Sequence, residues 1–231
     1  MKRSFDTIYE DKEILVVYKK SGLLTISTEN DDRHNLYRYV RDYLINKRAR
    51  AFIVHRLDRD TSGLILFAKN PGVKEMLQDC FEDQEVDRYY EAIVKESIPD
   101  GKEFKVEQYL AFDEKSGNVY PTRDKRIGKK AITLIKADHQ NKLGTVLSIK
   151  ILTGRKNQIR IALKTLGLTL LGDKKYSADS SKRMFLNAYK LAFPYELGLR
   201  KSVFEVKPLW LGSSSLDDSM PIEENTEPSS K

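Results

Sequence analysis

The stretch His55-Arg56-Leu57-Asp58-Arg59-Asp60-Thr61-Ser62-Gly63-Leu64 gathers charged and hydrogen-bonding side chains directly before an apolar run. Its ten residues include two arginines, two carboxylates, a histidine, a threonine and a serine. The apolar run that follows, 64–68 (LILFA), is typical of a buried strand. A polar segment that abuts such a strand predicts a functional site held by the core of the fold.

Hydrophobic spacing on both sides of this stretch predicts an α+β fold, with a mainly antiparallel mixed sheet flanked by a few helices and loops. One helix is expected over 35–46. A second begins at Asn70-Pro71, with asparagine as N-cap and proline at the first helical position. A third is expected over 157–166, with Asn157 able to cap it. Strands are expected at 5–9, 13–18, 64–68, 86–96, 104–112, 131–137, 145–152, 184–193 and 203–210.

Length and charge favour one basic domain followed by an acidic tail. The 231 residues carry a net charge of +7, but residues 211–231 carry −4, which leaves +11 on residues 1–210. We expect residues 1–210 to form the domain and residues 211–231 to be disordered, because few apolar side chains remain there. The basic body favours a nucleic-acid partner, the alternative being charge that serves solubility alone.

Several kinds of protein and site are disfavoured. No apolar stretch approaches the roughly 20 residues that span a bilayer, and no signal-peptide run follows Met1, so we expect a cytoplasmic protein without membrane contact. The lone Cys80 fits a reducing compartment, and we expect it to be buried. The histidines are far apart (His34, His55, His139), which predicts no metal site. Glycine-rich phosphate loops and the G-x-S-x-G elbow are absent from the sequence.

Asp58 is the first candidate for chemistry. It stands between Leu57 and Arg59, just before the predicted strand. A partly buried carboxylate beside an arginine can serve as a nucleophile or a base. The alternative is a structural aspartate–arginine pair that holds a turn, and the residues alone leave both interpretations open.

Two basic segments are candidates for phosphate binding. In 153–160 (TGRKNQIR), Gly154 permits a tight turn, and Lys156, Arg160 and Lys164 then recur every four residues. These three form either a solvated face or a phosphate-facing edge with one arginine turned inward to a carboxylate. The second segment is a predicted loop, 123–130, which is either solvated or in contact with a phosphate backbone. Its cations are Arg123, Lys125, Arg126, Lys129 and Lys130.

Tyr89 and Tyr90 are adjacent on a predicted strand, so one faces inward and the other outward. A buried tyrosine is either a core residue with a bonded hydroxyl or a platform for a flipped base.

Together these segments resemble the RluA-type pseudouridine synthases over most of residues 5–210. The stretch 55–64 matches the catalytic motif of that family without a gap. The other similar segments follow in the same order as in the family: 8–11 (IYED) with 15–17 (LVV), 88–94 (RYYEAIV, against K-x-Y-x-A-x-V), 153–160 (TGRKNQIR, against TGRTHQIR), 171–176 (LGDKKY, against V-G-D-x-x-Y) and 186–194 (LNAYKLAFP, against L-H-A-x-x-L-x-F).

The chain departs from the family pattern in three places. Asn157 and Asn187 stand where the family usually has histidine, and 19–22 (KKSG) stands where it has Lys-Pro. Neither histidine is, by resemblance, the catalytic group. Many relatives carry an N-terminal S4 RNA-binding domain, for which we expect no room before Asp58.

The resemblance implies a pseudouridine-synthase-like fold and the conversion of uridine in RNA to pseudouridine, with no cofactor or metal. Asp58 would be the catalytic carboxylate, either attacking C1′ of the sugar or assisting glycal formation. Arg160 would pair with Asp58, and Tyr90 would stack on the displaced base. Arg56 would occupy the gap left when the target nucleotide flips out.

The resemblance also implies the RNA contacts and the class of target. The 123–130 loop and Arg155 would hold phosphates of ribosomal or transfer RNA, read as a short stem-loop by a monomer. One rival is a non-catalytic RNA-binding protein that kept the fold. The other is an aspartate-dependent hydrolase of a small glycoside, which leaves the basic body unexplained.

Overall fold

The computed structural model describes residues 5–27, 34–179 and 181–207. The predicted acidic tail, 211–231, and the end of the last predicted strand, 208–210, lie outside these residues. The elements in chain order are β1 (Phe5–Glu10), β2 (Ile14–Lys19), α1 (Leu36–Ile45), β3 (Phe52–Ile53), β4 (Ser62–Ala68), α2 (Pro71–Glu82), β5 (Asp87–Val94), β6 (Glu103–Asp113), β7 (Asn118–Thr122), β8 (Lys129–Asn141), β9 (Gly144–Ile151), α3 (Gln158–Thr165), β10 (Leu186–Ala192), the 3₁₀ helix η1 (Tyr195–Leu197) and β11 (Val203–Glu205).

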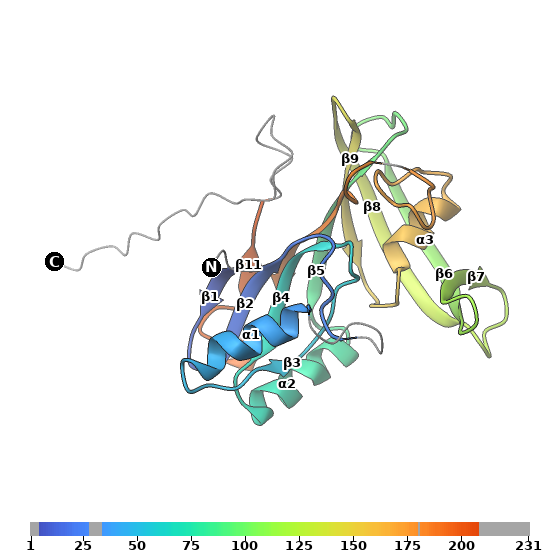
Figure 1. The fold of residues 1–231 in the computed structure, drawn as a ribbon. Coiled ribbons are helices and arrows are strands. Elements are labelled where there is room, and N and C mark those ends of the chain that lie inside the picture. The colour runs from blue at the N-terminus through green and yellow to red at the C-terminus, as the bar shows by residue number, and fades with distance from the viewer. Residues whose placement is uncertain (1–4, 28–33, 180, 208–231) are drawn as a thin grey trace.

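The described strands form one long sheet (Figure 1). Its order is β1-β2-β4-β10-β5-β9-β8-β6-β7, while β3 pairs with β4 and β11 with β10. Every neighbouring pair is antiparallel except β4 with β10, which run parallel over two residues each. The expected α+β fold with a mainly antiparallel mixed sheet is therefore confirmed.

The central strands are buried on both faces because helices cover both. On β2, Leu15 and Val17 pack in one hydrophobic cluster with residues of α1 and α3, whereas Ile14 and Val16 pack in another with residues of α2. That second cluster includes Cys80, which is buried as expected. Figure 1 shows α1 and α2 beside the β1–β2–β4 half of the sheet and α3 beside β8 in the other half.

One of the two predicted caps forms, that of Asn70, and Asn35 makes a cap that was not predicted. The side chain of Asn35 accepts a hydrogen bond from the Arg38 backbone, and that of Asn70 accepts one from Val73 at the start of α2. The prediction for the third helix was wrong in this detail. Asn157 precedes α3 in the left-handed region, at φ 54°, and its side chain makes no capping bond, because its amide is engaged elsewhere.

Gly63 makes the parallel pairing of β4 with β10 possible. Its φ is +124°, and a Cβ at this position would collide with the backbone of Ala188, its partner on β10. Ser62 and Gly63, which follow Asp58 by four and five residues, therefore join the β1–β2–β4 half of the sheet to the half that contains β10 and β5.

Candidate active site

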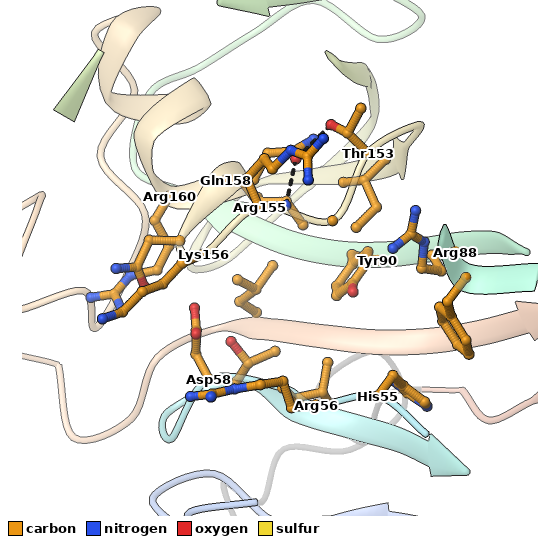
Figure 2. Close-up of a pocket in the computed structure, with 18 of the residues that line it drawn as sticks. His55, Arg56, Asp58, Arg88, Tyr90, Thr153, Arg155, Lys156, Gln158 and Arg160 are labelled. Carbon is orange, nitrogen blue, oxygen red and sulfur yellow. Dashed lines mark hydrogen bonds between the residues drawn. The ribbon is translucent and has the colours of Figure 1, made fainter. Parts of the chain in front are cut away.

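Two cavities, of about 570 and 750 Å³, meet at Asp58. The first runs from Asp58 past Tyr90 toward Arg88, and the second runs toward the segment 172–184. Figure 2 shows the 55–58 segment on one side of the first cavity and the 153–160 segment on the other. The two cavities share Arg56, Leu57, Asp58, Lys156, Asn157 and Arg160.

The backbone around Asp58 is held by the segment that follows β2. Thr25 Oγ1 donates to the carbonyl oxygen of Leu57 at 2.8 Å and accepts from its N–H at 3.2 Å. Ser21 Oγ donates to the carbonyl oxygen of Asp60 at 2.7 Å. The Asp58 side chain itself lies partly exposed where the cavities join.

Lys19 also holds the loop that contains Asp58. Its side chain is fully buried, and its ammonium donates to the carbonyl oxygens of Arg59, at 2.8 Å, and Leu23, at 2.7 Å. The backbone N–H of Gly22 also donates to Arg59, at 3.0 Å. The KKSG departure at 19–22 thus supplies direct supports of the Asp58 loop.

The predicted pairing of Arg160 with Asp58 was wrong. The Arg160 guanidinium makes a bidentate pair with Asp173, with Nε at 2.8 Å and Nη2 at 2.6 Å from the two carboxylate oxygens. Burial lowers the pKa of Arg160, but the bonds to Asp173 and the nearby Asp58 raise it overall. Arg160 therefore keeps its charge close to Asp58 while Asp173 orients it.

The two histidine-to-asparagine departures have defined contacts. Asn157 Nδ2 donates to the Tyr176 hydroxyl at 2.9 Å, and its Oδ1 accepts from Arg160 Nη1 at 3.1 Å. Asn187 is fully buried on β10, where its Oδ1 accepts from Tyr18 and Ser62, each at 2.9 Å. Both asparagines are thus part of the hydrogen-bonded frame around the cavities.

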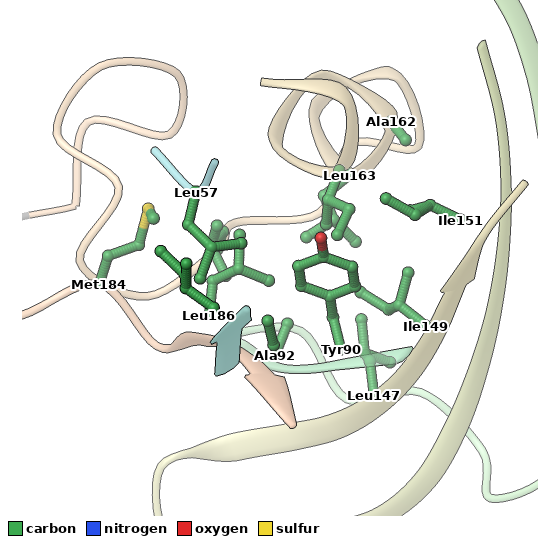
Figure 3. Packing of buried hydrophobic residues seen from close by; sticks show 14 of the residues in the cluster. Leu57, Tyr90, Ala92, Leu147, Ile149, Ile151, Ala162, Leu163, Met184 and Leu186 are labelled. Atoms are coloured by element: carbon green, nitrogen blue, oxygen red, sulfur yellow. The ribbon is translucent and has the colours of Figure 1, made fainter. Parts of the chain in front are cut away.

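Tyr90 faces the first cavity from β5, and Tyr89 faces the opposite side of the sheet against Tyr189, as the alternation predicted. Figure 3 shows the Tyr90 ring inside a cluster of apolar side chains that includes Leu57, Leu163 and Leu186. Burial raises the pKa of Tyr90 to about 12, an effect that Arg88 opposes and Asp58 reinforces. The phenol is therefore neutral near pH 7.

The turn before α3 places Arg155 and Lys156 on the cavity. Gln158 holds this turn, since its Oε1 accepts from Thr153 Oγ1 at 2.7 Å and from the Arg155 N–H at 3.0 Å (Figure 2). Its Nε2 donates to the carbonyl oxygen of Ile132 at 2.9 Å. Both basic side chains are exposed.

The basic loop 123–130 lies outside both cavities. The prediction of a loop holds for residues 123–128, whereas Lys129 and Lys130 begin β8. Arg126 pairs with Asp124 at 2.7 Å, and Lys130 pairs with Glu107 at 2.7 Å. The loop adjoins the site through Arg155, whose Nε donates to the Lys130 carbonyl oxygen at 3.0 Å. The structure therefore places Arg56 and Arg155 on the cavities but brings the loop only to their edge.

Sequence reasoning missed five basic residues that line the cavities. Four of them follow α3 on the second cavity: Lys174, Lys175, Lys182 and Arg183. The fifth is Arg88, on the first. The sequence held a signal for two of them, because Lys174 and Lys175 belong to the LGDKKY segment, whose aspartate pairs with Arg160.

The described residues contain no group of three or more histidine, cysteine, aspartate or glutamate side chains placed to hold a metal ion. No helix in this part of the chain is long and apolar enough to cross a bilayer.

Comparison with known proteins identifies relatives. Residues 13–165 match the sequence profile of the RNA pseudouridylate synthase family. A ribosomal large subunit pseudouridine synthase D from Borreliella burgdorferi is 32% identical over 86% of this chain and 62% of its own length. A dual-specificity RNA pseudouridine synthase RluA from Vibrio cholerae is 29% identical over 81% of this chain and 76% of its own.

Solved structures share the fold. Human RNA pseudouridylate synthase domain containing 1 superposes with a TM-score of 0.70 at 22% identity, over 89% of this chain and 84% of its own. The chain spans about six tenths of the length of the first curated relatives it matches.

Proposed function

The chain belongs to the RNA pseudouridylate synthase family, and we propose that it isomerises uridine in RNA to pseudouridine, with Asp58 as the catalytic carboxylate. In this reaction the bond between uracil N1 and ribose C1′ breaks, the base rotates, and C5 bonds to C1′. A proton is lost from C5 and one is gained at N1. No atom is added or removed, so the enzyme would be an isomerase.

The position of Asp58 between two cavities is the observation that carries this proposal. One cavity is floored by a buried aromatic ring and is suited to a base, while the other is rich in cations and is suited to a phosphate backbone. A carboxylate at their junction would meet the sugar that joins base to backbone. There it can attack C1′ or support an oxocarbenium-like state.

The neighbouring residues have separate roles in this proposal. Arg160, oriented by Asp173, would supply positive charge beside Asp58 and favour its carboxylate form. Tyr90 would stack on the displaced uracil and, being a neutral phenol, would act in proton transfer as a donor rather than as a base. Arg56, exposed at the cavity mouth, would fill the gap left by the flipped nucleotide.

The RNA would lie along the second cavity and the edge of the first. Lys174, Lys175 and Lys182 would contact phosphates there, and Arg155 would continue the path toward the 123–130 loop. The names of the two relatives above refer to the ribosomal large subunit and to dual specificity. We therefore propose ribosomal or transfer RNA in the cytoplasm as the target, read as a stem-loop by a monomeric domain of residues 1–210.

Replacing Asp58 by asparagine tests the proposal. The substitution keeps the side chain's size but removes the charge that would act at C1′. We expect pseudouridine formation in ribosomal and transfer RNA to fall by at least about 10²–10³-fold while RNA affinity is retained. Quantifying pseudouridine in RNA digests and RNA binding by the same preparations provides both readouts.

Asp42→Asn is the matched control. Asp42 lies on α1 outside both cavities, and its exposed carboxylate pairs with Arg41 at 3.1 Å. We expect this variant to retain most of the turnover. Equal loss in the two variants, or substantial turnover by Asp58→Asn, would remove Asp58 from the catalytic role.

A further inference from the structure

Arg88 carries a charge inside the first cavity that nothing in the described chain neutralises. Its side chain lies on β5 and is only 8% exposed. Within residues 5–27, 34–179 and 181–207 its guanidinium forms no hydrogen bond or ion pair, and its Nε is buried without a partner. The adjacent Asp87 is paired with Lys150 at 2.7 Å. Burying an unpaired charge is costly, so the arrangement is suited to an anion supplied from outside.

The direction of the side chain points to the same conclusion. Arg88 and Tyr90 are two residues apart on a strand, so they lie on one face of the sheet. Both line the first cavity, and Figure 2 shows them side by side, with Asp58 and Lys156 at the other end. An anion held by Arg88 would therefore lie beyond the Tyr90 ring as seen from Asp58.

Glu82 lines the same cavity, but it is exposed and forms no ion pair with Arg88 among the described residues. His55 stacks on Phe81, with ring centroids 4.6 Å apart, and its Nε2 accepts from the Leu66 N–H at 3.0 Å. Burial, with a contribution from Arg88, lowers the pKa of His55 to about 3, so the ring is neutral. Burial lowers the pKa of Arg88, and so does the charge of Arg155, which faces the same cavity.

Gly154 keeps this end of the cavity open. A Cβ on Gly154 would lie 2.5 Å from Arg88 Nη1. The sequence suggested that this glycine serves a tight turn, but its φ is not in the left-handed region. Its role is instead to let the turn before α3 pass close to the guanidinium.

The packing of the described residues around Arg88 does not supply hydrogen-bond acceptors for its guanidinium nitrogen atoms. The guanidinium carbon lies 5.7 Å from the centroid of the Phe81 ring, which is a cation–π contact. An aromatic face accepts charge but does not satisfy a fork of five N–H donors. The oxygen atoms of a phosphate match that fork in a bidentate geometry.

We propose that Arg88 binds a phosphodiester of the RNA strand next to the target uridine, on the side of Tyr90 remote from Asp58. This bond would fix the register of the strand, so that the target sugar meets Asp58. Arg88 would be a substrate-binding residue. The proposal rests on the proposed function for the identity of the ligand as RNA.

The test replaces single phosphates by neutral groups. A fluorescent RNA hairpin with uridines in its loop is made as a set in which each loop phosphodiester in turn is a methylphosphonate. We expect one position to weaken binding to the wild-type protein by about tenfold, and Arg88→Gln to weaken binding of the unmodified hairpin by a similar factor. A methylphosphonate at that same position should then cause no further loss of affinity for Arg88→Gln.

Two further variants complete the design. Arg41→Gln is the matched control, since Arg41 is an exposed arginine on α1 that pairs with Asp42. It should bind every hairpin as the wild type does. Arg88→Lys keeps the charge but loses the fork, so it should give an intermediate penalty, and it serves as the test if Arg88→Gln does not fold, as judged by its thermal melt.

The proposal is overturned if the full methylphosphonate penalty persists in the Arg88 variants, if no position carries a penalty, or if the wild type does not bind the hairpin. Pseudouridine formation on the unmodified hairpin and on cellular RNA is measured separately. Phosphate-specific binding that depends on Arg88 without any turnover would refute the proposed function and leave this inference standing. Turnover without phosphate-specific binding that depends on Arg88 would refute this inference and leave the proposed function standing.

Discussion

At the scale of one residue, the fold changes the pKa of the Glu91 carboxyl group. It lies on β5 between Ser148 of β9 and Asn187 of β10. Burial raises its pKa to about 7, and the nearby Asp138 and Glu205 add to the rise. Its Oε2 is buried without a hydrogen-bond partner among the described residues. The folded state therefore prefers the protonated carboxyl.

We expect Glu91→Gln to stabilise the protein in mild base. A carboxyl whose folded pKa lies above its unfolded value, near 4.5, favours folding below that value and loses this contribution as pH rises through about 7. The variant should be more stable than the wild type at pH 8, by on the order of 1 kcal/mol after solvent screening, and no more stable at pH 4. Thermal melts at both pH values measure this, and Glu114→Gln, at an exposed site, is the control.

Residue-level prediction from the sequence succeeded where a local rule decides. The alternation of a strand predicted that one of Tyr89 and Tyr90 faces inward, and Tyr90 does so. Helical spacing left two interpretations of Lys156, Arg160 and Lys164 open, and the structure agrees with the one in which an arginine turns inward to a carboxylate. Prediction failed for the partner of Arg160, because Asp58 and Asp173 both lie near the guanidinium. Which carboxylate bonds to it depends on the tertiary position of the loop after α3.

At the scale of elements, the parallel pairing of β4 with β10 decides where the site lies. The two strands pair over only Ser62–Gly63 and Asn187–Ala188. Ser62 Oγ and Tyr18 both donate to the Asn187 side chain at this point. The β1–β2–β4 half of the sheet is thus joined to the β5–β9 half beside the Asp58 loop.

We expect Gly63→Ala to destabilise the protein severely. The methyl group would meet the Ala188 backbone at a φ that L-residues avoid, at a cost on the order of 3 kcal/mol. Gly72→Ala, in the first turn of α2, is the control, because its Cβ would lie 3.6 Å from Asn70 Oδ1, an ordinary van der Waals contact. That change should be neutral or stabilising by about 0.5–1 kcal/mol. Denaturant unfolding of the two variants measures the difference, and equal stability would contradict the role given to Gly63.

The sequence predicted elements best where capping and periodicity agree, as at Asn70-Pro71 before α2. Two strands were missed. β7 is a short strand at one end of the sheet that contains Pro121, and β3 has two residues, so neither carries a period that can be detected. Asn157 was assigned a capping bond, but its amide joins Arg160 to Tyr176, a contact that only the folded chain creates.

At the scale of the whole molecule, the cations at the site come from segments far apart in the chain. Arg56 precedes β4, Lys156 precedes α3, and Lys174, Lys175 and Lys182 precede β10. Net charge indicated a polyanion partner, but the sequence drew attention to the compact 123–130 cluster. The fold instead collects dispersed residues into a basic cavity beside Asp58.

We expect the triple change of Lys174, Lys175 and Lys182 to glutamine to weaken RNA binding and its salt dependence. Removing one lysine–phosphate interaction lowers the slope of log affinity against log salt by about 0.7–0.9, so the slope should fall by roughly 2. The triple change of Arg123, Lys125 and Arg126 should have a smaller effect, because Arg126 is already paired with Asp124. Titrations at several salt concentrations compare the two, and an unchanged slope in the lysine variant would contradict the proposed RNA path.

Pseudouridine mapping of ribosomal and transfer RNA tests the central claim most directly. Cells lacking the gene are compared with the same cells carrying either the wild-type protein or Asp58→Asn at matched levels. The account predicts at least one uridine that is modified only with the wild-type protein, which would also identify the target. A site restored equally well by Asp58→Asn would contradict the role of Asp58, and no difference at any site would contradict the proposed activity on these RNAs.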